Sequence, residues 1–287
     1  MVADLTEATN TENGKPSLSI VIPMYNEIEN VVPMVARVHE GLASYEGDWE
    51  LLVVDDGSTD GTPQALYDES AKYGSHVRVI ELRRNFGQTA AMQAGIDEAR
   101  GYLIATLDGD LQNDPADIPR MVDHLLENKL DLLTGWRKNR KDDLILRKIP
   151  SRIANRLIGK ITGVRINDYG CSLKIYKASV IKQVRLYGEM HRFIPAWVAA
   201  VVPPSRIGEV VVTHNPRVAG ESKYGISRTF RVILDLLSVY FFMRYRARPG
   251  HFFGSIGLGL GSIGSLLLIY LGFVKFALGE DIGGRPL

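Results

Sequence analysis

The chain lacks several features that mark common protein classes. It has a single cysteine, Cys171, among 287 residues, which excludes an intrachain disulfide and is typical of a reducing, cytosolic setting. Residues 1–16 are polar, without the apolar core of a signal peptide, and are expected to be a disordered lead-in. The net charge of +1 predicts no nucleic-acid partner, so any basic function must be local.

Three kinds of site motif are also missing. No Gly-rich phosphate loop of the Walker type is present, and no G-x-G-x-x-G follows a predicted strand. The GLGLG run at 257–261 lies inside a long apolar segment, and the six histidines are scattered without zinc-ligand spacing. These absences argue against nucleotide binding through a Walker loop or a dinucleotide fingerprint, and against a zinc site.

Apolar, β-rich runs alternate with helical patterns over the first half of the chain. The expected strands, with the turns that follow them, are 18–26, 49–58, 77–85, 102–110 and 131–137. Helical spacing predicts helices at 29–45, 62–73, 88–100 and 116–128. This order predicts an α/β fold with a mostly parallel sheet and right-handed crossovers. The strands are near-continuous apolar runs, so both faces of the sheet are expected to be covered.

Polar motifs collect where four of these strands end: PMYNE, DDGSTD, DGDLQ and GWR. Ligands bind beyond the carboxyl ends of parallel strands, so the four segments are expected to form one site. Asp60 is expected to cap the helix that begins at 62. In the third motif, Asp108, Asp110 and Asp114 lie close together, and such carboxylates repel one another unless they share a cation or hydrogen-bond donors.

Six motifs in order carry a resemblance to a known family: VIPMYNE, VVDDGSTDGT, RNFGQTAAMQAG, DGDLQNDP, MHRFIP and RVAGESKYG. Together they resemble family 2 glycosyltransferases, above all the membrane-bound polyprenyl-phosphate glycosyltransferases related to dolichyl-phosphate mannose synthase. The resemblance extends from about Leu18 to the end of the chain. It implies a nucleotide-sugar-binding, GT-A-like α/β fold and the transfer of one sugar to a lipid phosphate.

The resemblance also implies site residues. The nucleoside cradle would be Pro23, Tyr25 and Glu27; the base and ribose contacts would be Val54 and Asp56, with Asp55 adjacent. The D-x-D segment Asp108–Gly109–Asp110 would face the diphosphate and a metal, with Gln112 as a further metal ligand. Arg137 would face the donor, and the phosphates of donor and acceptor would meet Arg192, Arg217 and Lys223.

Charge balance supports these roles independently. Two aspartates cannot bind a nucleotide diphosphate directly, so we expect Mg²⁺ or Mn²⁺ between them and the phosphates, acting as a Lewis acid on the leaving diphosphate. A lipid phosphate has a second pKa of about 6, so it is largely a dianion at neutral pH and already nucleophilic. A strong base is therefore not needed. Lys223 lies in a Gly/Ser-rich loop that is suited to closing over a ligand. Asp168 has three open roles: binding a sugar hydroxyl, orienting the acceptor phosphate, or capping a turn.

The segment 252–274 carries no charge, and as a helix it would be roughly 35 Å long, enough to cross a hydrocarbon core of about 30 Å. A buried soluble helix is the alternative. Arg244, Arg246 and Arg248 precede it and place the N-terminal side in the cytoplasm. Gly257, Gly261 and Ser265 have small-xxx-small spacing, which predicts a partner helix. The partner is expected from another subunit of a homo-oligomer, or else from a missing part of this chain.

Two basic, amphipathic segments are expected at the bilayer surface. In 147–163, Arg152, Arg156 and Lys160 recur on one helical face, and an ordinary surface helix is the alternative. Residues 227–250 repeat the pattern. The predicted organisation is therefore a lead-in (1–16), a cytosolic catalytic domain (17–226), a juxtamembrane helix (227–250), a transmembrane helix (251–276), and a tail or the start of a missing second span (277–287).

The predicted protein is an integral membrane glycosyltransferase with its catalytic domain on the cytoplasmic face. It would move one hexose, with inversion, to undecaprenyl or dolichyl phosphate; UDP-glucose is the favoured donor, and GDP-mannose and UDP-linked amino sugars stay open. A processive polysaccharide synthase is disfavoured because no Q-x-x-R-W sequence is present. A non-catalytic nucleotide-sugar-binding scaffold is disfavoured because the D-x-D segment and the basic loop are intact.

Overall fold

The computed structural model describes residues 16–138, 158–159, 162–216, 238, 240–242, 244–245 and 248–279. The chain divides into two compact units, Met1–Val239 and Tyr240–Leu287. Several sequence predictions lie wholly or largely outside the described residues: the lead-in 1–16, the amphipathic helix 147–163, most of 227–250, the tail 277–287, and both Arg217 and Lys223.

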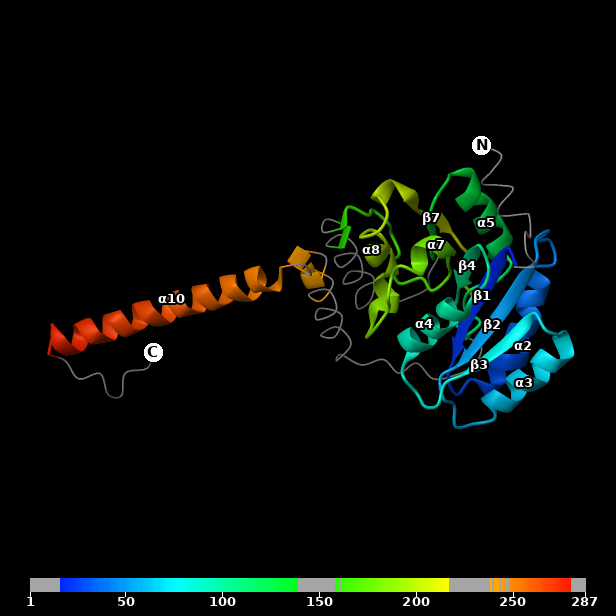
Figure 1. Ribbon diagram of the computed structural model, residues 1–287, viewed down its shortest axis with the longest axis horizontal. Helices are drawn as coiled ribbons and strands as arrows, with labels where there is room; N and C mark the ends of the chain where they lie inside the picture. The colour runs from blue at the N-terminus through cyan, green and yellow to red at the C-terminus, as the bar shows by residue number, and fades with distance from the viewer. Residues whose placement is uncertain are drawn as a thin grey trace. The chain divides into compact units, whose positions relative to one another are not determined.

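The first unit is built on one seven-stranded sheet (Figure 1). Its strands are β1 (Leu18–Met24), β2 (Trp49–Asp55), β3 (Val77–Glu81), β4 (Leu103–Thr106), β5 (Leu132–Trp136), β6 (Lys174–Lys177) and β7 (Ile207–Val211). Their order is β3-β2-β1-β4-β6-β5-β7, and β6 alone runs antiparallel to its neighbours β4 and β5. The prediction of a mostly parallel α/β sheet is confirmed.

Four helices connect the parallel strands: α2 (Ile28–Gly41), α3 (Thr62–Tyr73), α4 (Gln88–Glu98) and α5 (Asp117–Glu127). All four were predicted, and α3 has the expected bounds. Helix α4 ends before residue 100 because Ala99 is already extended, at φ −62° and ψ 136°, as the chain turns toward β4. Shorter elements follow: α7 (Ala178–Ile181), η2 (Met190–Phe193), α8 (Ile194–Val198) and η3 (Pro204–Arg206).

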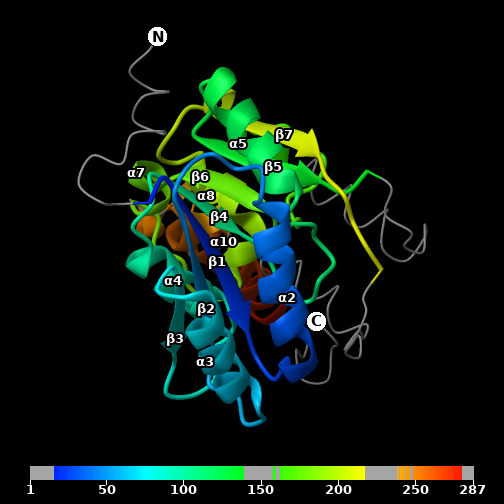
Figure 2. The same ribbon diagram turned by 90° about the vertical axis from the view of Figure 1, so that its right-hand side faces the viewer.

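Both faces of the sheet are covered, as the apolar strands require (Figures 1 and 2). Alternate residues of β1, including Leu18, Ile20 and Ile22, lie in one buried cluster with apolar side chains of α2, α3 and α5. Val21 points the other way, toward α4. There Gly95 allows the helix to approach closely, because an added Cβ would collide with the Val21 side chain.

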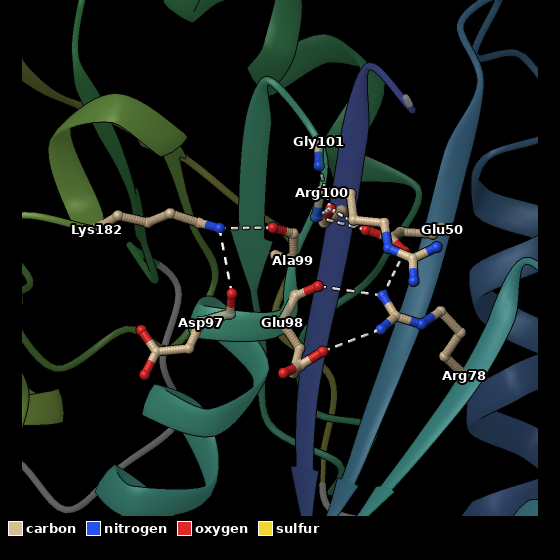
Figure 3. A network of polar contacts seen from close by, with 9 residues as sticks. Glu50, Arg78, Asp97, Glu98, Ala99, Arg100, Gly101 and Lys182 are labelled. Carbon is tan, nitrogen blue, oxygen red and sulfur yellow. Dashed lines mark hydrogen bonds and ion pairs between the residues drawn. The ribbon is translucent and has the colours of Figure 1, made fainter. Parts of the chain in front are cut away.

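A polar network fixes the amino ends of β2 and β3 to the end of α4 (Figure 3). The side chain of Glu50 is only 5% exposed; its Oε1 accepts from the Arg100 main-chain N–H at 2.7 Å, and its Oε2 from Arg78 Nη1 at 2.9 Å. Arg78 also donates to the Glu98 carbonyl and carboxylate. The Lys182 ammonium donates to the Ala99 carbonyl at 2.6 Å. The buried carboxylate is therefore paired, which offsets its desolvation.

The second unit contains α10 (Pro249–Phe276). An 18-residue window of this helix has a mean hydropathy of 1.9, and none of that window is buried against the protein. The helix begins two residues before the predicted transmembrane helix, 251–276, and ends at the predicted residue. By length and composition α10 is able to cross a membrane, as predicted.

Candidate active site

The carboxyl ends of β1 and β2 lie together and are joined by hydrogen bonds between their loops. Met24 is opposite Asp55 in the register of the two strands. The Asn26 N–H donates to Ser58 Oγ at 2.8 Å, and the Thr59 N–H donates to Asn26 Oδ1 at 2.8 Å. Two of the four polar motifs are thus held together. We call the loops after β1, β2, β4 and β5 the carboxyl edge.

The predicted nucleoside residues of the first loop lie at this edge. Pro23 is buried in β1, whereas Tyr25, directly after the strand, is 41% exposed. Glu27 precedes α2; its N–H donates to Thr62 Oγ1 at 3.0 Å, and its carboxylate accepts from Asn30 Nδ2. Of the three predicted residues, Tyr25 is therefore the exposed one, and its role in binding the nucleoside stays a prediction.

Asp55 and Asp56 are both buried but differ in their surroundings. The two oxygens of Asp56 accept from the main-chain N–H groups of Phe86 and Gly87, each at 2.8 Å, so this side chain fixes the loop before α4. Asp55 Oδ2 accepts from the Ser58 N–H at 3.0 Å, while Asp55 Oδ1 is buried with no hydrogen-bond partner among the described residues. A buried, unpaired carboxylate oxygen indicates a missing donor, such as a ligand N–H or O–H.

The D-x-D segment follows β4 directly. At Gly109 an added Cβ would lie 2.9 Å from Met24 Cγ and 3.3 Å from the Pro23 carbonyl oxygen, so a larger residue would require Met24 or the main chain of β1 to shift. Leu111 adopts φ 61°, an unfavourable backbone conformation for a branched side chain. The segment is therefore tightly constrained against the strands of the sheet, which positions both carboxylates.

Asp108 has two described hydrogen-bond contacts. Its Oδ1 accepts from Gln88 Nε2 at 2.6 Å, and its N–H donates to Ser172 Oγ at 3.3 Å. Burial, and then the charge of Asp110, raise the pKa of Asp108 above its ordinary value. The ionised pair of aspartates is therefore costly unless a cation is shared between them.

A divalent cation fits this pair of aspartates. The described residues contain no group of three or more His, Cys, Asp or Glu side chains able to hold a metal, so the protein offers few carboxylates there. Mg²⁺ and Mn²⁺ suit such a site, because one or two carboxylates are completed by substrate phosphates and water. Gln112 donates its main-chain N–H to Asp110 Oδ1 at 3.2 Å, and its side chain as a metal ligand stays a prediction.

Arg137 and Asp168, which the sequence analysis assigned separately, form an ion pair. Arg137 Nε lies 2.7 Å from Asp168 Oδ2, and Nη2 lies 3.0 Å from Oδ1. The side chains are 12% and 15% exposed. Burial alone would raise the pKa of Asp168, but hydrogen bonds from Arg137 lower it below its ordinary value. Asp168 also accepts from the Gly170 N–H at 3.2 Å, so it does cap a turn.

Sequence reasoning missed a buried cation below the site. Lys174 in β6 is 2% exposed, and its ammonium donates to the Cys171 carbonyl. Burial lowers the pKa of Lys174, and the charges of Cys171, Asp168 and Asp108 oppose that shift. Gln88 and Ser172 were missed as well. Gln88 lies in the RNFGQTAAMQAG motif, and Ser172 and Lys174 lie in no quoted motif. No spacing rule marked any of the three, because their contacts join segments far apart in the sequence.

Arg192 lies in η2 and forms an ion pair with Glu189 at 3.0 Å. Its neighbour His191 is close to the start of α4: His191 Nδ1 and Thr89 Oγ1 are 2.6 Å apart. Since α4 begins at Gln88, which contacts Asp108, η2 packs next to the D-x-D side of the carboxyl edge. The structure thus brings Asp108, Arg137 and Asp168 together and places Arg192 on a neighbouring element.

The chain is similar in sequence to known proteins. Residues 19–185 match the family described as Glycosyl transferase family 2. The chain is 67% identical, over 97% of its length and 82% of the relative's, to a dodecaprenyl-phosphate galacturonate synthase of Rhizobium johnstonii. It is 35% identical, over 94% of its length and 76% of the relative's, to an undecaprenyl-phosphate 4-deoxy-4-formamido-L-arabinose transferase of Pseudomonas fluorescens.

The fold is also similar to a solved structure. Glucosyl-3-phosphoglycerate synthase from Mycobacterium tuberculosis, crystallised with Mn²⁺, uridine diphosphate and glucosyl-3-phosphoglycerate, aligns with a TM-score of 0.61 at 15% identity. The alignment covers 85% of this chain and 84% of that one. A likeness at this identity concerns the fold alone. From the family match and the two relatives, the chain belongs to glycosyl transferase family 2.

Proposed function

We propose that the protein transfers one hexuronic acid residue from a nucleotide diphosphate-sugar to a polyprenyl phosphate. The observation that carries the proposal is the 67% identity, over 97% of the chain, to a relative named as a dodecaprenyl-phosphate galacturonate synthase. The sequence alone favoured UDP-glucose as the donor. Because the relative's name specifies galacturonate, we propose a uronic acid donor in place of UDP-glucose.

The donor would lie along the carboxyl edge, with its nucleoside at the loops after β1 and β2. The unpaired Asp55 Oδ1 would accept a hydrogen bond from the nucleoside. Asp108 and Asp110 would hold Mg²⁺ or Mn²⁺, which supplies Lewis-acid stabilisation of the leaving diphosphate when bound. Gly109 allows this segment to lie against β1, so both carboxylates reach the same edge.

The acceptor would react without a protein base. A phosphate monoester is largely a dianion at neutral pH, so one of its oxygens can attack the anomeric carbon directly. The new bond forms between that oxygen and the anomeric carbon while the bond to the diphosphate oxygen breaks, which inverts the centre and transfers no proton. Arg192, with Arg217 and Lys223 from outside the described residues, would hold the two phosphate groups close together.

The membrane supplies the acceptor in this proposal. Helix α10 would anchor the chain in the bilayer, and the arginines before it would place the catalytic unit on the cytoplasmic face. A polyprenyl chain could then stay in the bilayer while its phosphate reacts. Association of subunits through α10 and lipid contact by 147–163 belong to the same proposal.

A donor panel tests the proposal. Membranes containing the full chain are incubated with undecaprenyl or dodecaprenyl phosphate and labelled UDP-galacturonate, UDP-glucose, UDP-galactose or GDP-mannose. We expect labelled lipid chiefly from UDP-galacturonate, and only when polyprenyl phosphate is present. Transfer from UDP-glucose instead would restore the sequence-based donor. Binding of nucleotide-sugars without any transfer would favour the non-catalytic scaffold.

A further inference from the structure

The ion pair between Arg137 and Asp168 joins two segments that are 31 positions apart in the sequence. Arg137 directly follows β5, and Asp168 lies a few residues before β6, which is the antiparallel neighbour of β5. The contact is bidentate, at 2.7 and 3.0 Å, and both side chains are largely buried. Parallel N–H···O bonds of this kind fix the plane of a guanidinium as well as its position.

The carboxylate of Asp168 has little capacity left for a substrate. Its Oδ2 accepts from Arg137 Nε at 2.7 Å and from the Arg137 main-chain N–H at 3.4 Å. Its Oδ1 accepts from Arg137 Nη2 at 3.0 Å and from the Gly170 N–H at 3.2 Å. A carboxylate offers about four lone-pair positions, and here the protein occupies all four. Asp168 is therefore poorly suited to take a proton or to bind a sugar hydroxyl.

The guanidinium of Arg137, by contrast, keeps donors in reserve. Arginine carries about five N–H donors, and the described contacts of the Arg137 side chain use the Nε/Nη2 edge alone. The Nη1/Nη2 edge is a second fork that matches two oxygens of a phosphate or a carboxylate. The charge of Asp108 acts on Arg137, so the guanidinium lies within electrostatic range of the D-x-D segment.

We propose that Asp168 is a positioning residue, which holds Arg137 so that its second N–H edge binds an anionic group of the donor. The group is either a phosphate of the diphosphate or the carboxylate of the transferred uronic acid. The inference rests on the proposed function, because it needs a donor that binds at the D-x-D segment. It assigns the two residues to one functional unit.

If Arg137 and Asp168 act as one unit, the effects of their substitutions on kcat/KM should be non-additive. Arg137→Lys keeps the charge but loses the fork, and Asp168→Asn keeps the shape but loses the bidentate acceptor. Each is expected to lower kcat/KM by about 10- to 150-fold, as for one charge-assisted contact. The kcat/KM of the double variant should be at most about 3-fold lower than that of the less active single variant. Asp97→Asn is the matched control, because Asp97 forms an exposed ion pair with Arg185 and should keep wild-type kinetics.

Three outcomes would overturn the proposal: wild-type kinetics in Asp168→Asn, losses that multiply in the double variant, or a low-pH limb of kcat that disappears in Asp168→Asn. The last would show that Asp168 is a base. Thermal melts check that each variant is folded. If Asp168→Asn does not fold, Asp168→Glu, which keeps a carboxylate but displaces it by one methylene, is combined with Arg137→Lys instead. No further loss of kcat/KM relative to Arg137→Lys alone supports the unit, and losses that multiply oppose it.

Donor comparison identifies which oxygens Arg137 binds. If they belong to the sugar carboxylate, both variants should lose far more with UDP-galacturonate than with UDP-galactose, and binding of UDP alone should not change. If they belong to the diphosphate, both donors and UDP should weaken alike. A wild-type protein inactive with every donor would refute the proposed function. An active wild type with unaffected variants would refute this inference alone.

Discussion

The neighbouring residues Asp55 and Asp56 illustrate how little a shared residue type says about role. We predict that Asp56→Asn destabilises the protein by about 1–3 kcal/mol, because its amide N–H₂ would face a main-chain donor of Phe86 or Gly87. Asp55→Asn should leave the melting temperature unchanged or raised, because it removes a buried charge whose Oδ1 has no hydrogen-bond partner among the described residues, while the amide oxygen can still accept from the Ser58 N–H. It should nevertheless weaken nucleotide binding at least about 10-fold.

Thermal melts and calorimetric titration with UDP measure the two effects separately. Wild-type UDP affinity in Asp55→Asn would remove Asp55 from the nucleoside site. An unchanged melting temperature in Asp56→Asn would show that the loop before α4 is held by other contacts.

A second prediction at the scale of single residues concerns the metal. Asp110→Asn should nearly abolish transfer while the protein stays folded, because an amide keeps the shape but loses the charge that holds a divalent cation. EDTA should inactivate the wild type, and Mg²⁺ or Mn²⁺ should restore it. Asp114→Asn is the control, because Asp114 Oδ1 accepts from the Ala116 N–H near the start of α5. Full activity of Asp110→Asn, or of the chelated wild type, would contradict a metal role.

The sequence indicated which loops form the site but not how their side chains pair. Asp108, Gly109 and Asp110 were predicted from one short motif, because their position after a strand is a local property. The pairing of Arg137 with Asp168, and the burial of Lys174 below them, depend on β6 lying between β4 and β5. That arrangement is a long-range property, so each residue could be named while its partner could not.

At the scale of elements, the first five strands were predictable and the last two strands were not. Strands β1 to β5 are apolar runs followed by turn residues, which is a strong local signal. Strand β6 has the sequence KIYK, with a lysine at each end, and its burial in the structure depends on partners such as Asp131, which lies 3.8 Å from Lys177 Nζ. Strand β7 lies at the edge of the sheet and, among the described strands, pairs with β5 alone. The formation of both strands therefore depends on contacts with distant parts of the chain, which a local sequence pattern does not reveal.

The ends of α2 and α3 meet the starts of β2 and β3 in an aromatic cluster with a histidine pair. His39 Nε2 and His76 Nε2 are 2.9 Å apart, and His39 Nδ1 lies 2.8 Å from the Val35 carbonyl. Tyr73 stacks on His39 with ring centroids 4.0 Å apart, and Trp49 meets both histidines edge-on. Burial, and then the charge of His39, lower the pKa of His76 below 6.5.

This shift predicts a pH-dependent stability. Because the folded pKa of His76 is lowered, the unfolded chain binds the proton more readily, so stability falls as the pH drops through 6.5 toward the folded pKa. From pH 7.5 to 5.5, the melting temperature of the wild type should therefore fall more than that of His76→Gln. His124→Gln, in α5, is the control and should follow the wild type. Equal slopes for the wild type and His76→Gln would show that His76 does not contribute to the pH dependence of stability in this range.

At the scale of the whole molecule, the two units have opposite surface chemistry. The first buries its apolar side chains in the sheet core, and its charged residues are largely exposed or paired. The second exposes most of α10, including Leu258, Leu266, Leu268 and Ile269, each at least 66% exposed. An apolar surface of this extent needs cover from lipid or from other protein. A membrane span explains it without a second protein.

The last prediction tests that span directly. The double variant Ile263→Arg, Leu266→Arg would place two charges near the middle of α10. Each charge there costs roughly 2.5–3.5 kcal/mol on insertion scales. The double variant should lose retention in alkaline-washed membranes. Phe276→Arg, at the end of the helix, should stay in the pellet because its side chain can reach the interface. Loss of polyprenyl transfer, with donor binding kept, would show that α10 presents the enzyme to its lipid. Full retention of the double variant would mean that α10 is covered by protein or that another segment anchors the chain.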